Sequence, residues 1–103
     1  MSDLDDFLRF SEVRSAVSCD FSGAFHDGFQ EPDGEAVAAV IGLVALTLQQ
    51  SGEHLGLGEL QTVSIAGPVI GRLIVRRASV VLTATIEPAK ALPAVLKALE
   101  GAR

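Results

Sequence analysis

Residues 36–48 form a continuous apolar run, AVAAVIGLVALTL, in which Thr47 is the one polar side chain. With 3.6 residues per turn, a helix of this composition is apolar on every side, so a single layer of structure cannot cover it. The run is also shorter than the roughly 20 apolar residues that a helix needs to cross a bilayer. We therefore predict a helix that packs on its own domain along one side and on another molecule along the other.

The composition predicts a single globular domain over residues 1–103, because 49% of the residues are hydrophobic and 20% are charged. A net charge of −5 with eight basic residues argues against binding to a nucleic-acid backbone or an anionic membrane surface. Cys19 is the single cysteine, so no intrachain disulfide can form. The N-terminal residues MSDLDDFLRF lack the basic-then-apolar layout of a signal peptide, which predicts a cytoplasmic protein.

The apolar spacing predicts three helices, over residues 3–10, from 33 to 50 or beyond, and after Pro88 with Pro93 in the first turn. Alternation with a period of two predicts five strands, over residues 14–21, 24–29, 59–66, 72–77 and 80–86. The order is α-β-β-α-β-β-β-α, and the short connections between the last three strands imply antiparallel pairing. We predict an α+β fold in which helices sandwich a five-stranded antiparallel sheet.

Several stretches, taken together, resemble the roadblock/LC7 family. They are the hairpin with its turn at residues 20–23, the helix EAVAAVIGLVALTLQQ, and the segments LGLGELQTVSI, GPVIG and VVLTATIEPAKALPAVLKAL. The resemblance extends from about Val13 to Leu99 and depends on order and pattern, whereas the first helix is shorter than is usual in the family. It implies a profilin-like layout and a homodimer or heterodimer in which the long helices pair. It also implies that the third strand, with Thr62, Val63, Ser64 and Ile65, pairs across the twofold axis into a ten-stranded sheet.

Many roadblock domains bind small Ras-like GTPases as activating, exchange-assisting or scaffolding subunits, so the resemblance implies such a partner here. The leading hypothesis is a non-catalytic, homodimeric regulator or adaptor of a small GTPase, with the paired long helices as the docking platform. The alternative is a purely structural dimerisation subunit of a larger complex without a GTPase partner. An enzyme with a pocket between sheet and helices is the third hypothesis, and no convergent polar set on an inferred face favours it.

A step of 100° per residue divides the long helix into stripes. The stripe that suits packing on the sheet is bulky, with Val37, Ile41, Val44 and Leu48. Roughly opposite lie Ala39, Leu43, Leu46 and Gln50. A flanking stripe of mostly small residues holds Ala38, Gly42, Ala45 and Gln49.

Gly42 costs about 1 kcal/mol relative to alanine inside a helix, which indicates a close approach of another backbone. Leaving Leu43 and Leu46 in water would forfeit about 1.5–3 kcal/mol for each side chain. We therefore predict that Ala39, Gly42, Leu43 and Leu46 meet the twofold-related helix. The stripe of Ala38, Gly42, Ala45 and Gln49 is then the predicted GTPase platform. The competing interpretation is the central helix of one larger core, which two short terminal helices are poorly suited to complete.

Several other residues give weaker signals of function. Arg72, Arg76 and Arg77 could meet an acidic partner, but a solvated sheet face that pairs with local carboxylates is the favoured interpretation. Val69 and Ile70 occupy a loop tip, where they either contact a partner or tuck against a neighbouring element. His26 and His54 have no metal-like spacing, Cys19 faces the core, and we predict no metal, cofactor, catalytic residue or small-molecule substrate.

Overall fold

The computed structural model describes residues 4–58 and 61–101. The elements occur in the predicted order, and a short 3₁₀ turn precedes the last helix. They are α1 (Asp5–Leu8), β1 (Val13–Asp20), β2 (Phe25–Phe29), α2 (Gly34–His54), β3 (Thr62–Ala66), β4 (Gly71–Arg77), β5 (Val80–Ile86), η1 (Ala89–Ala91) and α3 (Leu92–Gly101). The predicted starts of the first helix at Asp3 and of the third strand at Glu59 lie outside the described residues.

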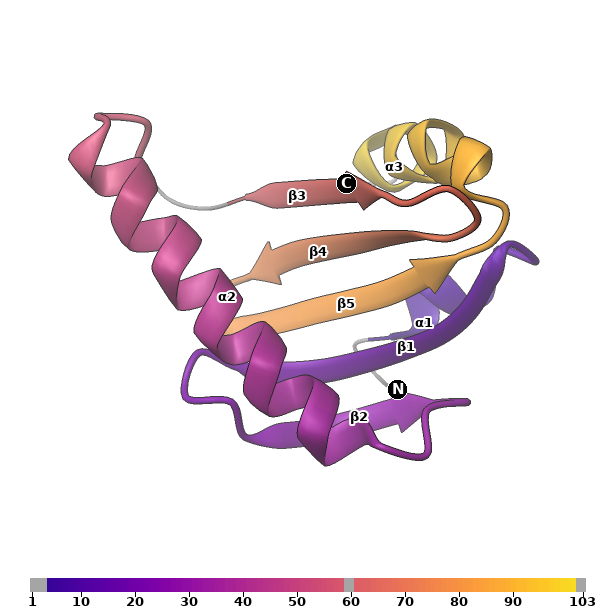
Figure 1. Ribbon diagram of the computed structural model, residues 1–103, viewed down its shortest axis with the longest axis horizontal. Helices are drawn as coiled ribbons and strands as arrows, with labels where there is room; N and C mark the ends of the chain where they lie inside the picture. The colour runs from indigo at the N-terminus through magenta and orange to yellow at the C-terminus, as the bar shows by residue number, and fades with distance from the viewer. Residues whose placement is uncertain (1–3, 59–60, 102–103) are drawn as a thin grey trace.

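The five strands form one antiparallel sheet in the order β2-β1-β5-β4-β3, which confirms the predicted α+β fold. The two edges of the sheet are therefore β2 and β3. Gly23, with φ of +85°, allows the turn that joins β1 to β2. As Figure 1 shows, α2 crosses one face of the sheet, and α1 and α3 lie on the opposite face.

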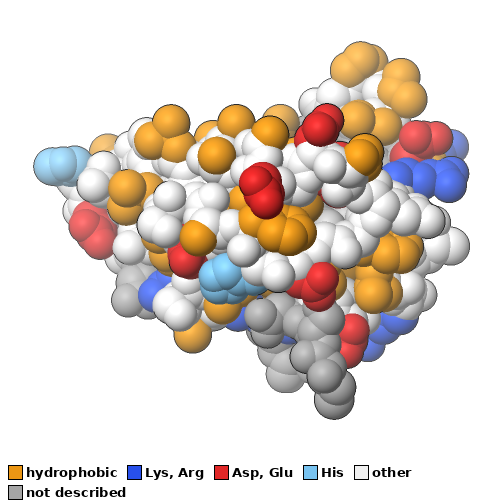
Figure 2. All heavy atoms as spheres, turned by 90° about the horizontal axis from the view of Figure 1, so that it is seen from below, with side chains coloured by type: hydrophobic (Ala, Val, Ile, Leu, Met, Phe, Trp, Pro, Cys, Tyr) orange, Lys and Arg blue, Asp and Glu red, His pale blue; other side chains and the backbone are white. Residues whose placement is uncertain are grey.

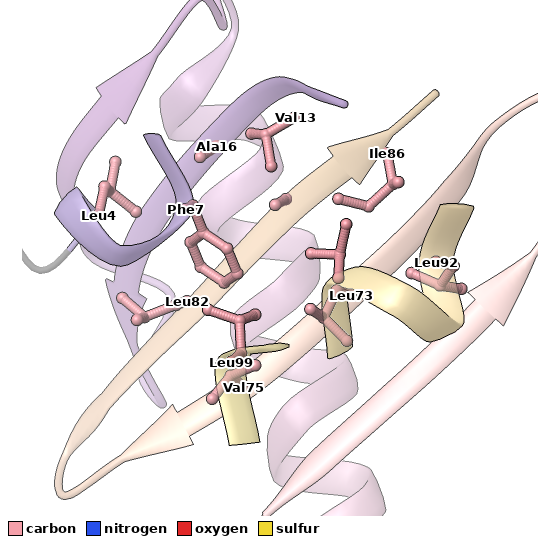
Figure 3. Packing of buried hydrophobic residues seen from close by; sticks show 12 residues of the cluster. Leu4, Phe7, Val13, Ala16, Leu73, Val75, Leu82, Ile86, Leu92 and Leu99 are labelled. Atoms are coloured by element: carbon pink, nitrogen blue, oxygen red, sulfur yellow. The ribbon is translucent and has the colours of Figure 1, made fainter. Parts of the chain in front are cut away.

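The larger hydrophobic core lies between the sheet and the two terminal helices. Phe7 of α1 and Leu99 of α3 approach Leu82 of β5 in this layer, as Figure 3 shows. The apolar stripe of α3 faces this core, because Leu92, Val95 and Leu99 are buried and Leu96 is half-buried. Each such leucine contributes about 1.5–3 kcal/mol by leaving water, so this layer holds α1 and α3 on the sheet.

The smaller core lies under α2, where Ala38, Ile41 and Ala45 pack against the sheet. The helix lies mainly over β1, β2 and β5, which leaves part of β3 and β4 uncovered on this face. By length and composition alone, α2 could span a membrane, although the apolar run within it was expected to be too short. Its packing across the sheet is what the central helix of a globular domain requires.

The predicted bulky stripe only partly faces the sheet. Ile41 is buried as expected, but Val37, Val44 and Leu48 are half-buried. The helix is rotated about its axis relative to the prediction, so its smallest residues take the inner position.

Candidate functional site

An apolar surface on α2 faces away from the sheet. Its larger side chains are exposed: Val40 by 61%, Leu43 by 67% and Leu46 by 38% of their surface. Ala36 and Ala39 are exposed beside them. Figure 2 shows hydrophobic side chains following one another along the margin of the molecule that α2 forms. We call these five residues the outer face of α2. A contiguous apolar surface of this kind on a small protein is typical of an interaction site.

The structure contradicts the prediction that the small-residue stripe is a docking platform. Ala38 and Ala45 are 0% exposed, and Gly42 is buried as well. Gln49 is half-buried, and its Oε1 atom is inaccessible. These residues face the chain's own sheet and hairpin, so a partner cannot reach Ala38, Gly42 or Ala45.

Gly42 is also wrongly assigned to the dimer interface. A Cβ atom added at Gly42 would lie 2.6 Å from the Cα of Gly23 and 3.0 Å from the carbonyl oxygen of Asp20. The close backbone approach that the helical glycine indicated is therefore real, but it is made by the turn between β1 and β2 of the same chain. Ala39, Leu43 and Leu46, predicted for the same interface, do lie on the accessible side.

The edge strand β3 lies across a groove from the outer face of α2, with Val40 on the helix side and Ile65 on the strand side. It pairs with β4 alone, in the register Thr62 with Val75 through Ala66 with Gly71, and its other edge meets no strand of the described chain. Ser64 and Ile65 are exposed, and Thr62 and Val63 are half-buried. Unpaired backbone groups at a sheet edge can accept a further strand. The four residues predicted to pair across a twofold axis therefore lie at an accessible edge.

A groove with a volume of about 520 Å³ runs between α2 and the uncovered part of the sheet. The helix side is formed by Val37, Val40 and Val44. Ile65 of β3 and Arg72 of β4 line the sheet side. We call it the Arg72 groove, since Arg72 is the basic residue that lines it.

Arg72 is fixed on the floor of this groove by hydroxyl groups. Its two terminal nitrogens donate hydrogen bonds to Oγ1 of Thr83 at 2.9 Å and to Oγ1 of Thr85 at 3.2 Å. Ser15 Oγ donates to the same Oγ1 atom of Thr85 at 2.9 Å. Burial lowers the pKa of Arg72, while the nearby charge of Glu31 opposes this shift. The favoured prediction was pairing with local carboxylates; the hydrogen bonds of Arg72 go to hydroxyls instead, and Glu31 acts on it only through its nearby charge.

The other two arginines lie at the opposite end of β4. The guanidinium of Arg76 lies 5.8 Å from the centroid of the Phe21 ring, within the range of a cation–π contact. Arg77 is half-buried. Arg72, Arg76 and Arg77 therefore do not form one exposed basic cluster.

The turn under α2 has its own polar network, centred on Asp20. One carboxylate oxygen accepts hydrogen bonds from the backbone N–H of Ser22 at 2.9 Å and of Ala24 at 3.1 Å, and from the Ser22 hydroxyl. The Ser22 hydroxyl and the Ala24 N–H are the main causes that lower the pKa of Asp20 to about 2. His26 Nε2 lies 3.4 Å from the other carboxylate oxygen. This network stabilises the hairpin turn.

Cys19 is buried in the core under α2, as predicted, and burial raises the pKa of its thiol. This environment disfavours the nucleophilic thiolate. Within residues 4–58 and 61–101, no three His, Cys, Asp or Glu side chains gather in a metal-binding group.

Further exposed apolar residues lie outside the outer face of α2. The loop-tip residues Val69 and Ile70 are 64% and 46% exposed, so in the isolated chain they do not tuck away. Sequence reasoning missed Val40 on the outer face of α2. It also missed Leu55 and Leu57, which are 73% and 76% exposed after the end of α2. Their position between Gly52, Gly56 and Gly58 was the available signal, since glycine-rich turns rarely bury large side chains.

Comparison with known proteins identifies the fold. No protein-family model matches the chain, and no curated protein matches it. Myxococcus xanthus MglB superposes with a TM-score of 0.77 at 14% identity, over 92% of this chain and 83% of that one. A roadblock/LC7 domain from Streptomyces avermitilis gives a TM-score of 0.73 at 16% identity, over 97% of each chain. The gliding protein MglB from Thermus thermophilus gives 0.74 at 18% identity, over 93% of this chain and 78% of that one. The chain therefore has the roadblock/LC7 fold that its sequence resembles.

Proposed function

We propose that this chain is a non-catalytic, cytoplasmic subunit that dimerises through α2 and β3 and regulates or recruits a small Ras-like GTPase. The observation that carries the proposal is the apolar outer face of α2 beside the unpaired edge of β3, on a roadblock/LC7 fold. That fold is the one for which the sequence resemblance implied dimers and GTPase partners.

The energetics of the outer face support the proposed dimer. Leu43 is 67% exposed and Val40 61% exposed, and covering side chains of this size contributes about 1.5–3 kcal/mol each. A second copy that adds its own β3 to this edge would also satisfy the free backbone groups of the strand. Because the same patch of each copy contacts its counterpart across a twofold axis, the result is a closed dimer and not a filament.

The GTPase-docking surface must differ from the one predicted from sequence, because the small-residue stripe is buried. After two copies pair, the parts of the outer faces that remain open along the two α2 helices form a shared surface across the twofold axis. We assign the docking role to that shared surface. Any effect on hydrolysis would then come from positioning the switch regions of the GTPase.

Light scattering tests the dimer. We expect the wild-type chain to elute at twice its 10.7 kDa mass. Leu43→Glu should elute as a monomer with an unchanged circular dichroism spectrum, because the side chain is exposed within one copy. Val69→Glu places the same charge at an equally exposed site on the loop tip and should remain dimeric. A wild-type monomer at high micromolar concentration would overturn the proposal.

A pull-down tests the partner. Tagged wild-type protein and Leu43→Glu are incubated with lysate of the source cell loaded with a non-hydrolysable GTP analogue or with GDP. We expect mass spectrometry to find a small Ras-like GTPase with the wild-type dimer in one nucleotide state and not with Leu43→Glu. A dimer that captures no GTPase in either state would instead favour the purely structural role.

A further inference from the structure

The turn between β3 and β4 holds two exposed apolar side chains in a fixed position. Val69 and Ile70 are 64% and 46% exposed. The backbone N–H of Gly67 donates a hydrogen bond to the carbonyl oxygen of Ile70 at 2.9 Å. The N–H of Ala89 in η1 donates one to the carbonyl oxygen of Val69 at 2.8 Å. A pre-ordered turn loses little conformational entropy when it docks on a partner. We call residues 67–70 the loop tip.

The two apolar side chains of the loop tip belong to different faces of the sheet. Gly71 faces the terminal helices, since a Cβ atom added there would lie 3.1 Å from the side chain of Leu92. Arg72, the next residue, lines the groove on the α2 face. Alternation along the chain therefore directs Ile70, directly before Gly71, to the α2 face and Val69 away from it.

A pocket of about 340 Å³ lies at the opposite end of β3, also on the α2 face. Leu48 of α2 and Val63 of β3 line it, and both are half-buried. Leu55 and Leu57 line it as well and are 73% and 76% exposed, so the isolated chain leaves this apolar pocket open. We call it the Leu57 pocket. Figure 1 shows the end of α2 near the start of β3 and the loop tip beyond the other end of the strand.

We propose that the loop tip of a second copy docks in the Leu57 pocket, with Ile70 of that copy packing against Leu55 and Leu57. The inference rests on the dimer of the proposed function, in which β3 pairs with its own copy. Two copies of one strand edge that are related by a twofold axis pair antiparallel. The residues that follow β3 in one copy therefore lie beside the residues that precede β3 in the other.

The faces of the two sheets also agree. In a continuous sheet of two antiparallel copies the twofold axis is perpendicular to the sheet, so both copies present their α2 faces on the same side. The side chain of Ile70 and the Leu57 pocket are therefore on one side of the ten-stranded sheet. The contact occurs twice in the symmetric dimer, and it covers exposed aliphatic side chains on both partners, which favours association.

The first experiment measures the dimer dissociation constant of the full chain by sedimentation velocity. We expect Ile70→Glu and Leu57→Glu each to raise it by about tenfold or more, because each variant places a carboxylate in both apolar contacts. Val69→Glu is the matched control, since it adds the same charge to the neighbouring residue of the loop tip. It should stay within about threefold of the wild type.

The second experiment uses a disulfide that can form only between copies. Within one chain, positions 57 and 70 are separated by the five residues of β3, which span about 17 Å at 3.4 Å per residue. A disulfide requires Cα atoms within about 7 Å. Oxidation of the variant with both Leu57→Cys and Ile70→Cys should therefore give a covalent dimer on a non-reducing gel, and each single variant should not.

Three outcomes would count against the docking. A wild-type dimer whose dissociation constant is unchanged by Ile70→Glu, or a cysteine pair that gives no covalent dimer, would overturn this inference and leave the proposed dimer intact. Equal losses from Val69→Glu and Ile70→Glu would overturn the assigned contact of Ile70. A monomeric wild type would overturn the proposed function and this inference together.

Discussion

The inner and outer sides of α2 are both apolar, but the inner side combines Ile41 with small residues, whereas several large side chains lie outside. On the inner side Ala38 and Ala45 are fully buried, whereas on the outer side Val40 and Leu43 are more than half exposed. If the hydrophobic effect alone oriented the helix, the larger side chains would lie inside. The distance between α2 and the turn at Gly23 decides instead, because the backbones approach too closely for any side chain at Gly42. Close packing of the domain therefore leaves the larger residues free for a partner.

The largest predicted effect comes from placing a side chain at Gly42, where the backbone of α2 approaches the turn at Gly23. Gly42→Leu should lower the free energy of unfolding by at least about 3 kcal/mol, because the backbone of Gly23 and Asp20 lies where the side chain must go. Urea unfolding followed by circular dichroism measures this. Ala39→Leu adds the same side chain on the exposed side and should change stability by less than about 0.5 kcal/mol in dilute solution, where the copies are separate. Equal urea midpoints for the two variants would contradict the assigned orientation of α2.

Two neighbouring branched aliphatic residues allow the inner and outer sides of α2 to be compared directly. Ile41 is 5% exposed and Val40 is 61% exposed. Ile41→Ala should therefore cost about 2–5 kcal/mol at any protein concentration. Val40→Ala should cost under about 0.5 kcal/mol in dilute solution, and its cost should grow with concentration if Val40 is covered in a dimer. A large, concentration-independent loss at Val40 would show that the outer face is covered within one copy.

The sequence was sufficient to predict the order of elements because each strand has a clear two-residue alternation. Alternation in the fourth strand puts Leu73 and Val75 on one face and Ile74 on the other, and the structure has the first two in one core and Ile74 in the other. The buried face of α3 could also be predicted, since the polar residues of this helix mark its solvent-exposed side.

The orientation of α2 was harder to read, since between residues 36 and 50 only Thr47 and Gln50 mark its outer side with a polar side chain. Gly42 was correctly interpreted as a point of close approach, but the sequence could not say which backbone approaches. That depends on where the hairpin turn lies after folding, a long-range contact between Gly23 and Gly42. Likewise, the hydroxyl partners of Arg72 come from a neighbouring strand, so its position in a groove followed only from the sheet register.

The smallest predicted effect tests the turn on which the inner side of α2 rests. Hydrogen bonds lower the pKa of Asp20 from the ordinary 3.8 to about 2 in the folded state. Between these values the unfolded chain binds the proton more readily, so stability contributed by Asp20 is present above about pH 4 and is lost as the pH falls toward 2. Asp20→Asn should therefore flatten the dependence of the urea midpoint on pH in this window.

Two further variants make this result specific. Ser22→Ala removes the hydroxyl donor and should raise the pKa of Asp20, which the carboxyl carbon shift in an NMR titration reports directly. Glu35→Gln, at an exposed carboxyl of α2, should keep the wild-type slope between pH 4 and 2. If Asp20→Asn also kept that slope, the pKa of Asp20 would not be lowered in the folded state, and its charge would not stabilise the turn against which Gly42 packs.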